Sequence, residues 1–451
     1  MSCNHVQSGF PARGRKRESD DFVGRQDTAS SACRLQPVWS PMLDRIKVAF
    51  VAPSLRILGG QAVQADRLLS AWKNDPDVEA WLVPVNPLPP RALAFAQDVK
   101  FLRTVVNELT YLPLLVRELA RADVVHVFSA SYSSFLLAPL PAMLVARALG
   151  KPVVLNYRSG QAPDHLQRSA VARNAIARVD LNVVPSRFLV DVFHEFGIDA
   201  SIIPNIVDLD RFQFRDRNPL RPRLVSTRNF DALYNVTTTV RAFALVQQRW
   251  PDASLTLVGG GPQEAQLREL VDQLRLRNVT FLGRVTPGEI AQHYAENDIY
   301  IQSPNIDNMP TSVIEAFASG LPVVSTEAGG VPAILTHERH GLLAPLGDYD
   351  RLAAHVLRLL DNPVWARAMA RAAFDTCQAC TWPAVRDQWL RAYRSAAAIA
   401  ARRRARTAKA FAERGIDPAS AAASAERRPH AQSVQAFAER RAHPRHAERR
   451  A

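Results

Sequence analysis

Short apolar runs recur along the middle of the chain, and helix-like patterns separate them. Two successive sets of six are present, namely IKVAFVAPS, VEAWLVPV, VVHVFS, PVVLNYR, DLNVVPS and ASIIPN, then RLVSTRN, SLTLVGGG, VTFLGRV, DIYIQSP, LPVVSTE and GLLAPL. Their Val, Ile and Leu residues do not alternate strictly with polar ones, which is typical of parallel strands buried on both faces. The intervening helical stretches supply right-handed crossovers. The pattern predicts an α/β protein with two doubly wound parallel-sheet domains.

The same pattern divides the chain into segments. The two sets of runs meet at IPNIVDLDRFQFRDRNPLRPR, a stretch rich in charge and proline. We expect a first domain at 45–207, a second at 208–381, and a helix at 382–400 that crosses back to the first domain. The ends, 1–44 and 401–451, have little to bury and are expected to be mostly disordered, with a fluctuating Ala-rich helix near 396–412.

Composition describes a globular body with basic ends. The 451 residues are 47% hydrophobic and 22% charged, with a formal net charge of +13. Residues 396–451 hold 13 Lys or Arg against 5 Asp or Glu, and so contribute +8 of that charge. The body is only mildly basic, and we expect no nucleic-acid partner. The tail is either a solvated segment or an electrostatic tether to anionic membrane lipid.

No segment has the character of a secretory signal or a membrane span. The N-terminal stretch is basic but lacks an apolar h-region. The most apolar run, FLLAPLPAMLVA, holds two prolines and is too short to cross a bilayer. We expect a cytoplasmic protein, with at most peripheral contact at the inner face of the membrane.

Two motifs with metal-binding spacing are interpreted as structural. Cys377 and Cys380 have CxxC spacing, but no second pair stands at zinc-ligand distance. The DLD at 208–210 lies in a strand-to-linker loop, where a turn with a helix N-cap is the commoner role. Neither motif therefore predicts a metal site.

Glycine-rich turns and two acids are expected at the carboxyl ends of the strands, where open α/β folds bind ligands. Gly59 and Gly60 precede a helix in the first domain, and Gly260 lies between a strand and a helix in the second. Such glycines allow backbone amides to approach a phosphate or a sugar. Asp307 precedes another helix and Glu315 lies inside it. Carboxylates accept hydrogen bonds from vicinal hydroxyls, so ribose, diphosphate and sugar would each find a partner there.

The order and spacing of these motifs resemble a retaining glycosyltransferase of family 4. The strongest mark is the E-x7-E motif, here Asp307, seven residues and Glu315; the supporting marks are GGQ, VVPSRF, IPNIVDLDRF, LVGGGP, FLGRV, EAFASGLPVV and AGGVP. The resemblance covers residues 46–400. It implies the GT-B fold, with two facing Rossmann-like domains and an interdomain cleft.

The resemblance also implies roles for individual residues. Glu315 resembles the acid that holds the donor ribose, and Asp307 resembles the acid that contacts the donor sugar. Arg228 resembles the basic residue that neutralises the leaving phosphate. The remaining residues expected around the donor are Gly59, Gly60, Arg158, Gly260, Asn308, Met309, Pro310, Thr311 and Ser312, the last two near the diphosphate.

Several positions depart from the family pattern. Tyr234 stands where a Lys usually follows Arg228, which removes one positive charge expected near the diphosphate. Arg158 stands where many relatives have His; it either binds phosphate or an acidic acceptor, or is a surface residue. Asp307 is a shorter acid than the usual Glu, and Ala333 also stands where a Glu commonly follows GGVP. His126 is interpreted as structural rather than catalytic.

The implied reaction moves a sugar from a nucleoside diphosphate sugar, which is the donor substrate, to an acceptor hydroxyl, with retention and without a metal or another cofactor. The acceptor would be a glycan, a lipid-linked molecule or a small molecule, as in the synthesis of surface polysaccharide or glycolipid. Two alternatives stay open. One is a non-catalytic scaffold subunit that binds the nucleotide sugar, and the other is a sugar-nucleotide epimerase on the same fold.

Overall fold

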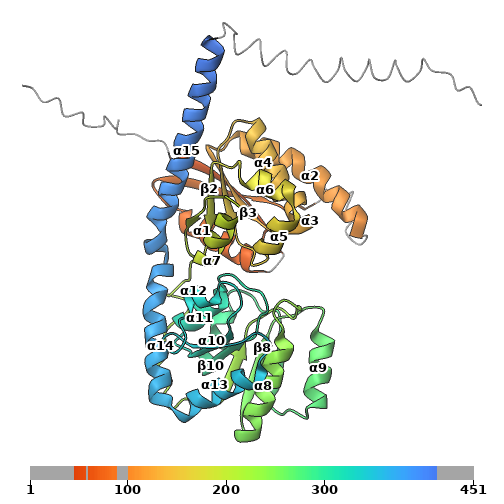
Figure 1. Cartoon of the computed structure of the whole chain (residues 1–451), viewed down its shortest axis with the longest axis vertical. Helices are drawn as coiled ribbons and strands as arrows, with labels where there is room; N and C mark the ends of the chain where they lie inside the picture. The colour runs from red at the N-terminus through yellow and green to blue at the C-terminus, as the bar shows by residue number, and fades with distance from the viewer. Residues whose placement is uncertain (1–44, 57–58, 89–99, 414–451) are drawn as a thin grey trace, which may run out of the picture. The chain divides into compact units, whose positions relative to one another are not determined.

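A computed structural model describes residues 45–56, 59–88 and 100–413. The expected N-terminal extension, 1–44, and the part of the expected tail beyond residue 413 lie outside the described residues. The described part holds two six-stranded sheets, and the strand pairs within both are parallel (Figure 1). The predicted pair of doubly wound parallel-sheet domains is confirmed.

The N-terminal sheet has the order β2-β1-β3-β4-β5-β6. Its strands are β1 (Ile46–Ala52), β2 (Val78–Pro84), β3 (Val124–Ser129), β4 (Val153–Tyr157), β5 (Leu181–Val184) and β6 (Ser201–Ile202). Strands β3 and β4 are buried at every residue, as expected where helices cover both faces of a sheet. The helices are α1 (Gly60–Trp72), α2 (Lys100–Ala120), α3 (Tyr132–Leu137), α4 (Pro139–Ala148), α5 (Ala162–Arg168), α6 (Ala170–Ile176) and α7 (Arg187–Glu195).

The C-terminal sheet has the order β12-β11-β10-β7-β8-β9. Its strands are β7 (Arg223–Ser226), β8 (Ser254–Val258), β9 (Val279–Gly283), β10 (Ile299–Gln302), β11 (Val323–Thr326) and β12 (Leu342–Ala344). The order reverses beside β7, which is the switch point where such sheets bind ligands. The helices are α8 (Val236–Arg249), α9 (Glu264–Gln273), α10 (Ile290–Glu296), α11 (Thr311–Ala318), α12 (Val331–Ile334), α13 (Tyr349–Asp361) and α14 (Pro363–Cys377), followed by the short η2 (Gln378–Cys380).

The last helix, α15 (Trp382–Glu413), returns from the C-terminal domain and packs on the N-terminal sheet (Figure 1). Trp389 and Tyr393 are buried there in one core with β1 and β3. The helix continues past the boundary expected at residue 400, so the first part of the expected tail, 401–413, is helical. Ala396 and Ala400 are fully buried, and the Ala and Arg residues that follow have high helix propensity.

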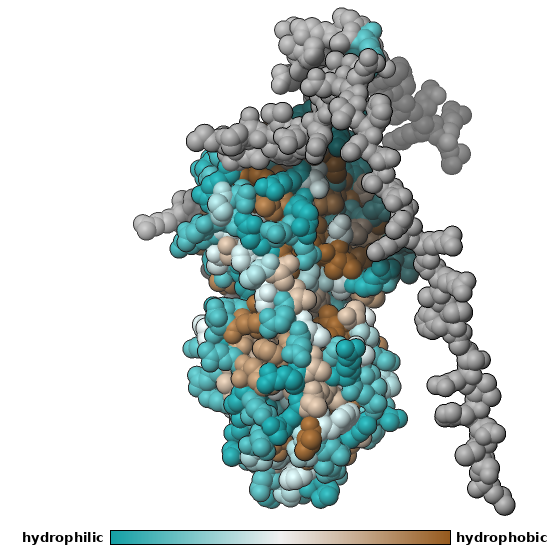
Figure 2. All heavy atoms as spheres, turned by 90° about the vertical axis from the view of Figure 1, so that its left-hand side faces the viewer, coloured by the Kyte–Doolittle hydropathy of each residue, from teal (hydrophilic) through white to brown (hydrophobic). Residues whose placement is uncertain are grey.

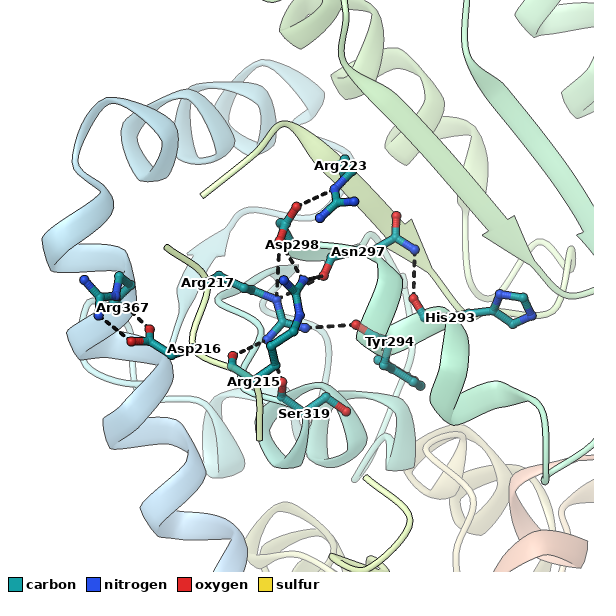
Figure 3. Close-up of polar contacts among 10 residues, drawn as sticks. All are labelled: Arg215, Asp216, Arg217, Arg223, His293, Tyr294, Asn297, Asp298, Ser319 and Arg367. Atoms are coloured by element: carbon teal, nitrogen blue, oxygen red, sulfur yellow. Dashed lines mark hydrogen bonds and ion pairs between the residues drawn. The ribbon is translucent and has the colours of Figure 1, made fainter. Parts of the chain in front are cut away.

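A cluster of three arginines around the buried Asp298 fixes the linker between the two sheets. Figure 3 shows Asp298 among Arg215, Arg217 and Arg223, and its carboxylate accepts from Arg215 at 2.7 Å and Arg223 at 2.6 Å. Arg217 is 1% exposed and donates to the carbonyl oxygens of Tyr294, Asn297, Ser319 and Arg215. Burial lowers the pKa of Arg217 to about 9. A buried charge with this many partners holds the linker to the C-terminal domain.

The surface of the described residues carries both polar and apolar side chains. On the face turned to the viewer in Figure 2, polar residues in teal predominate over the lower half, with apolar residues in small brown groups. Among the described residues, no helix combines the length and the apolar character that crossing a bilayer requires.

Candidate functional site

A cleft of about 630 Å³ lies where strands of both sheets end. Its size is typical of small-molecule sites. The N-terminal domain contributes Gly59, Gly60, Gln61, Arg67, Ser131, Tyr132 and Arg158, among others; the C-terminal domain contributes Thr227, Arg228, Tyr234, Gly259, Arg284, Asp307, Asn308, Met309, Pro310, Thr311, Ser312 and Glu315, among others. The predicted site residues therefore come together around one cleft, with the exception of Gly260.

Arg228 and Asp307 form an ion pair in the cleft wall. The Arg228 guanidinium donates to Asp307 Oδ2 at 2.5 Å and to Ser312 Oγ at 3.0 Å. Both charged side chains are nearly buried, with 9% and 13% exposed. Burial by itself disfavours the charged guanidinium, but the Asp307 carboxylate more than offsets it and raises the pKa of Arg228. The arginine thus stays cationic beside the entrance of α11.

Tyr234 lies directly against this arginine. The Arg228 guanidinium carbon is 4.0 Å from the centre of the Tyr234 ring, a cation–π distance. The family pattern expects a Lys at this position. Here the aromatic face stabilises the existing cation in place of a second positive charge.

Glu315 is held from both domains. Arg67 of α1 donates to Glu315 Oε1 at 2.7 Å, and Tyr294 of α10 donates to Glu315 Oε2 at 3.0 Å. The Arg67 and Glu315 side chains are 9% and 10% exposed. Within the described part of the chain, each carboxylate oxygen has one protein partner, and it keeps further lone pairs for a ligand hydroxyl. Sequence reasoning missed Arg67, because it carries no local motif and lies 248 positions from its partner.

Tyr294 is held in place by a hydrogen bond from the arginine cluster of Figure 3. Its backbone carbonyl oxygen accepts from Arg217 at 2.9 Å, and its hydroxyl lies 2.7 Å from Thr227 Oγ1. Burial and the nearby Glu315 carboxylate raise the Tyr294 pKa well above its usual range. The phenol therefore stays protonated and can donate to Glu315.

The loop before α11 is clamped by the N-terminal domain. Asn205 Nδ2 donates to the Met309 carbonyl oxygen at 2.7 Å, and Ser186 Oγ donates to Asn308 Oδ1. Asn308 is 3% and Met309 is 7% exposed. A Cβ on Gly160 would lie 2.9 Å from the Asp307 carbonyl carbon. The position of Asp307 therefore depends on contacts from both domains.

Several glycines permit close contacts between backbone segments. A Cβ on Gly329 or Gly330 would lie 2.2 Å and 2.1 Å from the carbonyl oxygens of Asp307 and Asn308. In the GGGP turn, a Cβ on Gly259 would lie 2.1 Å from the Arg228 carbonyl oxygen. Gly260 in the same turn faces the Arg284 side chain and is not among the residues that line the cleft.

Gly59 and Gly60 differ from Gly259, Gly329 and Gly330. Among the described residues, a Cβ at either would meet nothing within 4 Å, and both line the cleft at the start of α1. The backbone there is open to a ligand. This is the arrangement expected of glycines that let a phosphate or a sugar approach a helix start.

Arg158 lies in the cleft wall. It donates to the Oδ1 atoms of Asn205 and, at 3.4 Å, Asn156, and burial lowers its pKa to about 9. Behind it, His126 lies between Asn156 at 3.1 Å and Tyr393 at 2.9 Å. Burial, with Arg158 nearby, lowers the His126 pKa well below its usual range. His126 does not line the cleft.

The residues with metal-binding spacing have other contacts. Asp208 Oδ1 accepts the backbone N–H of Asp210 at 3.1 Å, which closes a turn. Cys377 and Cys380 are buried free thiols, and burial raises the pKa of Cys380 to about 11. In the described ranges, no group of three or more His, Cys, Asp or Glu side chains is placed to hold a metal ion.

Two family models match the chain. One, described as Glycosyltransferase Family 4, covers residues 58–211, and one described as Glycosyl transferases group 1 covers residues 221–362. Together they span more than half of the chain, with one model on each domain.

Curated relatives match over part of their length. A sulfoquinovosyl transferase of Arabidopsis thaliana is 24% identical over 310 residues, which are 63% of this chain and 59% of that protein. A GDP-mannose-dependent alpha-(1-6)-phosphatidylinositol monomannoside mannosyltransferase of Mycobacterium tuberculosis is 31% identical over 197 residues, which are 39% of this chain and 51% of that protein. The chain thus spans little more than half the length of these relatives.

Solved structures share the fold. The Anabaena protein HepE in complex with UDP-glucose superposes with a TM-score of 0.63 at 18% identity, over 78% of this chain and 100% of that one. Sucrose-phosphate synthase of Thermosynechococcus elongatus gives 0.59 at 22% identity, over 78% and 98%. These likenesses establish the GT-B arrangement of two Rossmann-like domains.

Proposed function

The chain belongs to glycosyltransferase family 4, and from this premise we propose that it transfers a sugar from a nucleoside diphosphate sugar to an acceptor hydroxyl, with retention of configuration. The observation that carries the proposal is the Arg228–Asp307 pair beside Glu315, at the entrance of one helix in the interdomain cleft. A cation and two acids at this spacing offer separate partners to the phosphates, the sugar and the ribose.

The nucleoside end of the donor is assigned to Glu315. The ribose diol would donate hydrogen bonds to the lone pairs that Arg67 and Tyr294 leave unused. Because both protein partners are already in place, the carboxylate is oriented before the nucleoside arrives. Binding then costs less side-chain entropy of the protein than it would at a mobile acid.

The diphosphate is assigned to the start of α11 and to Arg228. The residue before this helix, Pro310, provides no side-chain cap, so the first backbone N–H groups can donate to an anion. Arg228 and the helix dipole would stabilise the charge that develops on the leaving phosphate. The proposal therefore needs no metal ion for this step.

The sugar is assigned to Asp307. Its carboxylate already accepts from Arg228 at 2.5 Å and from the Asn308 backbone N–H at 2.8 Å. An acid engaged in this way is a poor nucleophile, which favours a front-face reaction. In that reaction the acceptor oxygen bonds to the anomeric carbon as the bond to the diphosphate breaks, and the acceptor proton passes to the leaving phosphate oxygen.

Nucleotide binding tests the donor site first. We expect calorimetric titration with UDP, GDP and ADP to show binding of one nucleotide, and Glu315→Ala to weaken it clearly. Glu269→Ala is the matched control, because Glu269 is an exposed acid on α9. Binding that is indifferent to Glu315 would contradict the assignment. Absence of any nucleotide binding would contradict the transferase.

Product analysis separates the transferase from an epimerase. The nucleotide that binds in the titration determines which sugar nucleotides are tested as donors. Each donor is incubated with the protein, once without an acceptor and once with a glycan, a lipid-linked or a small-molecule acceptor. A transferase releases nucleoside diphosphate and elongates one acceptor, with the anomeric configuration unchanged by NMR. A changed sugar still attached to its nucleotide, formed without acceptor, would replace the transferase with the epimerase. Nucleotide binding without turnover would point to the scaffold subunit.

We further propose a cytoplasmic location, with the basic tail contacting anionic lipid at the inner face of the membrane. Liposome co-sedimentation would compare the full chain with a chain ending after Glu413. An end point at Ala396 is unsuitable, because Ala396 is fully buried in the core of the N-terminal domain and Ala400 is fully buried as well. Equal binding of the two proteins at low salt would rule out the tether.

A further inference from the structure

A second cavity lies in the N-terminal domain, apart from the donor cleft. It measures about 500 Å³ and lies between α4 and α6, beside Arg403 of α15. Val153 and Asp180, which line it, stand at the amino ends of β4 and β5. The donor cleft lies where the strands end. The second cavity therefore lies at the amino ends of the N-terminal strands and the donor cleft at their carboxyl ends, so the second is not an extension of the first.

This cavity combines an apolar lining with a cationic rim. The apolar residues are Leu140, Met143, Leu144, Val153, Val171, Ala175 and Val179; the charged ones are Arg147, Lys151, Arg178, Arg403 and Asp180. Leu144 is 58% exposed and Val171 is 55% exposed. Large apolar side chains thus stay in contact with water at the cavity itself.

The charge of the rim is not balanced within the described protein. Asp180, the acid of this group, pairs with Arg403 at 2.8 Å and accepts the Val153 backbone N–H at 2.9 Å. Among the described residues, Arg147, Lys151 and Arg178 have no carboxylate partner. Three cations therefore surround an apolar cavity and can attract an anion.

We propose that this cavity binds a membrane lipid with an anionic headgroup. The acyl part would lie against Met143 and Ala175, and the headgroup would meet Arg147, Lys151 and Arg178. Apolar surface beside unpaired cations is the pattern that binds anionic lipid surfaces. The chain's own tail and a second copy of the chain are disfavoured as occupants, because both carry net positive charge.

Photolabelling of the unmodified full chain locates the lipid. The probe is phosphatidylglycerol with a photoreactive group on its acyl chain, in phosphatidylcholine vesicles. After irradiation, mass spectrometry of the digested protein is expected to show the label on peptides from α4 or α6. Label confined to the basic tail, or absent from both helices, would overturn the proposal.

Vesicle flotation with full-chain variants tests the two parts of the cavity separately. Lys151→Gln combined with Arg178→Gln removes two rim cations, and we expect about a tenfold or larger loss of binding to phosphatidylglycerol vesicles. Arg241→Gln combined with Arg249→Gln removes two exposed cations from α8 and should leave binding unchanged. Ala175→Trp fills the cavity without changing charge and should also weaken binding.

The outcomes distinguish the cavity from general electrostatic attraction. Equal losses for the two charge pairs would attribute binding to net charge alone and reject the cavity. Unchanged binding of Ala175→Trp would reject the acyl part of the proposal, provided that circular dichroism shows the variant to be folded. Cavity variants that alter the oligomeric state but not vesicle binding would identify a second copy as the occupant. Because none of these assays involves a nucleotide, failure here leaves the proposed transferase untouched.

Discussion

The ion pair between Arg67 and Glu315 joins the two domains beside the proposed ribose site, and its removal has a calculable effect. We expect Arg67→Met to lower the free energy of unfolding by about 3 kcal/mol, because it leaves a nearly buried carboxylate without its charged partner. This value is the low end of the usual range of about 3–5 kcal/mol. Glu315 keeps its hydrogen bond from Tyr294 at 3.0 Å, and its side chain is 10% exposed.

Substitution of the other partner, Glu315, should lower the free energy of unfolding by a smaller amount. In Glu315→Gln, Arg67 retains the Ile206 carbonyl oxygen at 3.0 Å and the face of the Phe212 ring, so we expect a loss of about 2 kcal/mol. In the double variant neither charge is left unpaired. We expect a total loss of about 3 kcal/mol rather than 5, which is a coupling energy of about 2 kcal/mol.

Equilibrium urea unfolding of the four proteins measures this coupling. Tryptophan fluorescence and circular dichroism should both follow the transition, to establish that the same unfolding step is compared. Arg241→Met, an exposed arginine on α8, is the matched control and should change the free energy by less than about 0.5 kcal/mol. If the two single losses add to within about 0.5 kcal/mol, the pair does not join the domains in solution and the reasoning is refuted.

Three further predictions concern the cleft and its surroundings. Arg228→Lys should lower turnover about 100-fold, by analogy with loss of one preorganised charge donor. Nucleotide affinity measured by calorimetry should stay within about tenfold of the unsubstituted protein. Unchanged turnover would show that Arg228 does not act in the site. Gly330→Ala should destabilise the protein by about 2 kcal/mol in urea, because its Cβ would lie 2.1 Å from the Asn308 carbonyl oxygen; Gly288→Ala, with a nearest atom at 3.8 Å, is the control. His126 should make stability fall as pH drops below its ordinary pKa of 6.5, by about 1.4 kcal/mol per pH unit, because the unfolded chain then binds a proton that the folded one does not. A stability curve between pH 5 and pH 7 that is the same in His126→Gln would contradict this.

Most of the fold could be predicted from local sequence patterns. Short apolar runs predict the strands, and the helical stretches between the runs predict that the strands pair in parallel. The helix between Asp307 and the region beyond Glu315 was also expected from sequence, and in the structure Pro310 precedes it and Gly320 follows it with a left-handed φ of 73°. The bound expected at residue 400 for the last helix was too short, since helix length there depends on burial of Ala396 and Ala400 as well as on composition.

Some residues of the candidate site could be predicted from the sequence, and others could not. Asp307 and Glu315 could be chosen from sequence, because their spacing around a helix start is a local property. Their partners could not be chosen in this way, since Arg67 reaches Glu315 from another domain and Gly160 approaches Asp307 across the cleft. An ion pair or a close backbone contact between distant elements depends on how the domains dock, and no periodicity along the chain records that docking. The sequence by itself thus determined the two sheets and the two acids, whereas the tertiary structure decided which charges neutralise them.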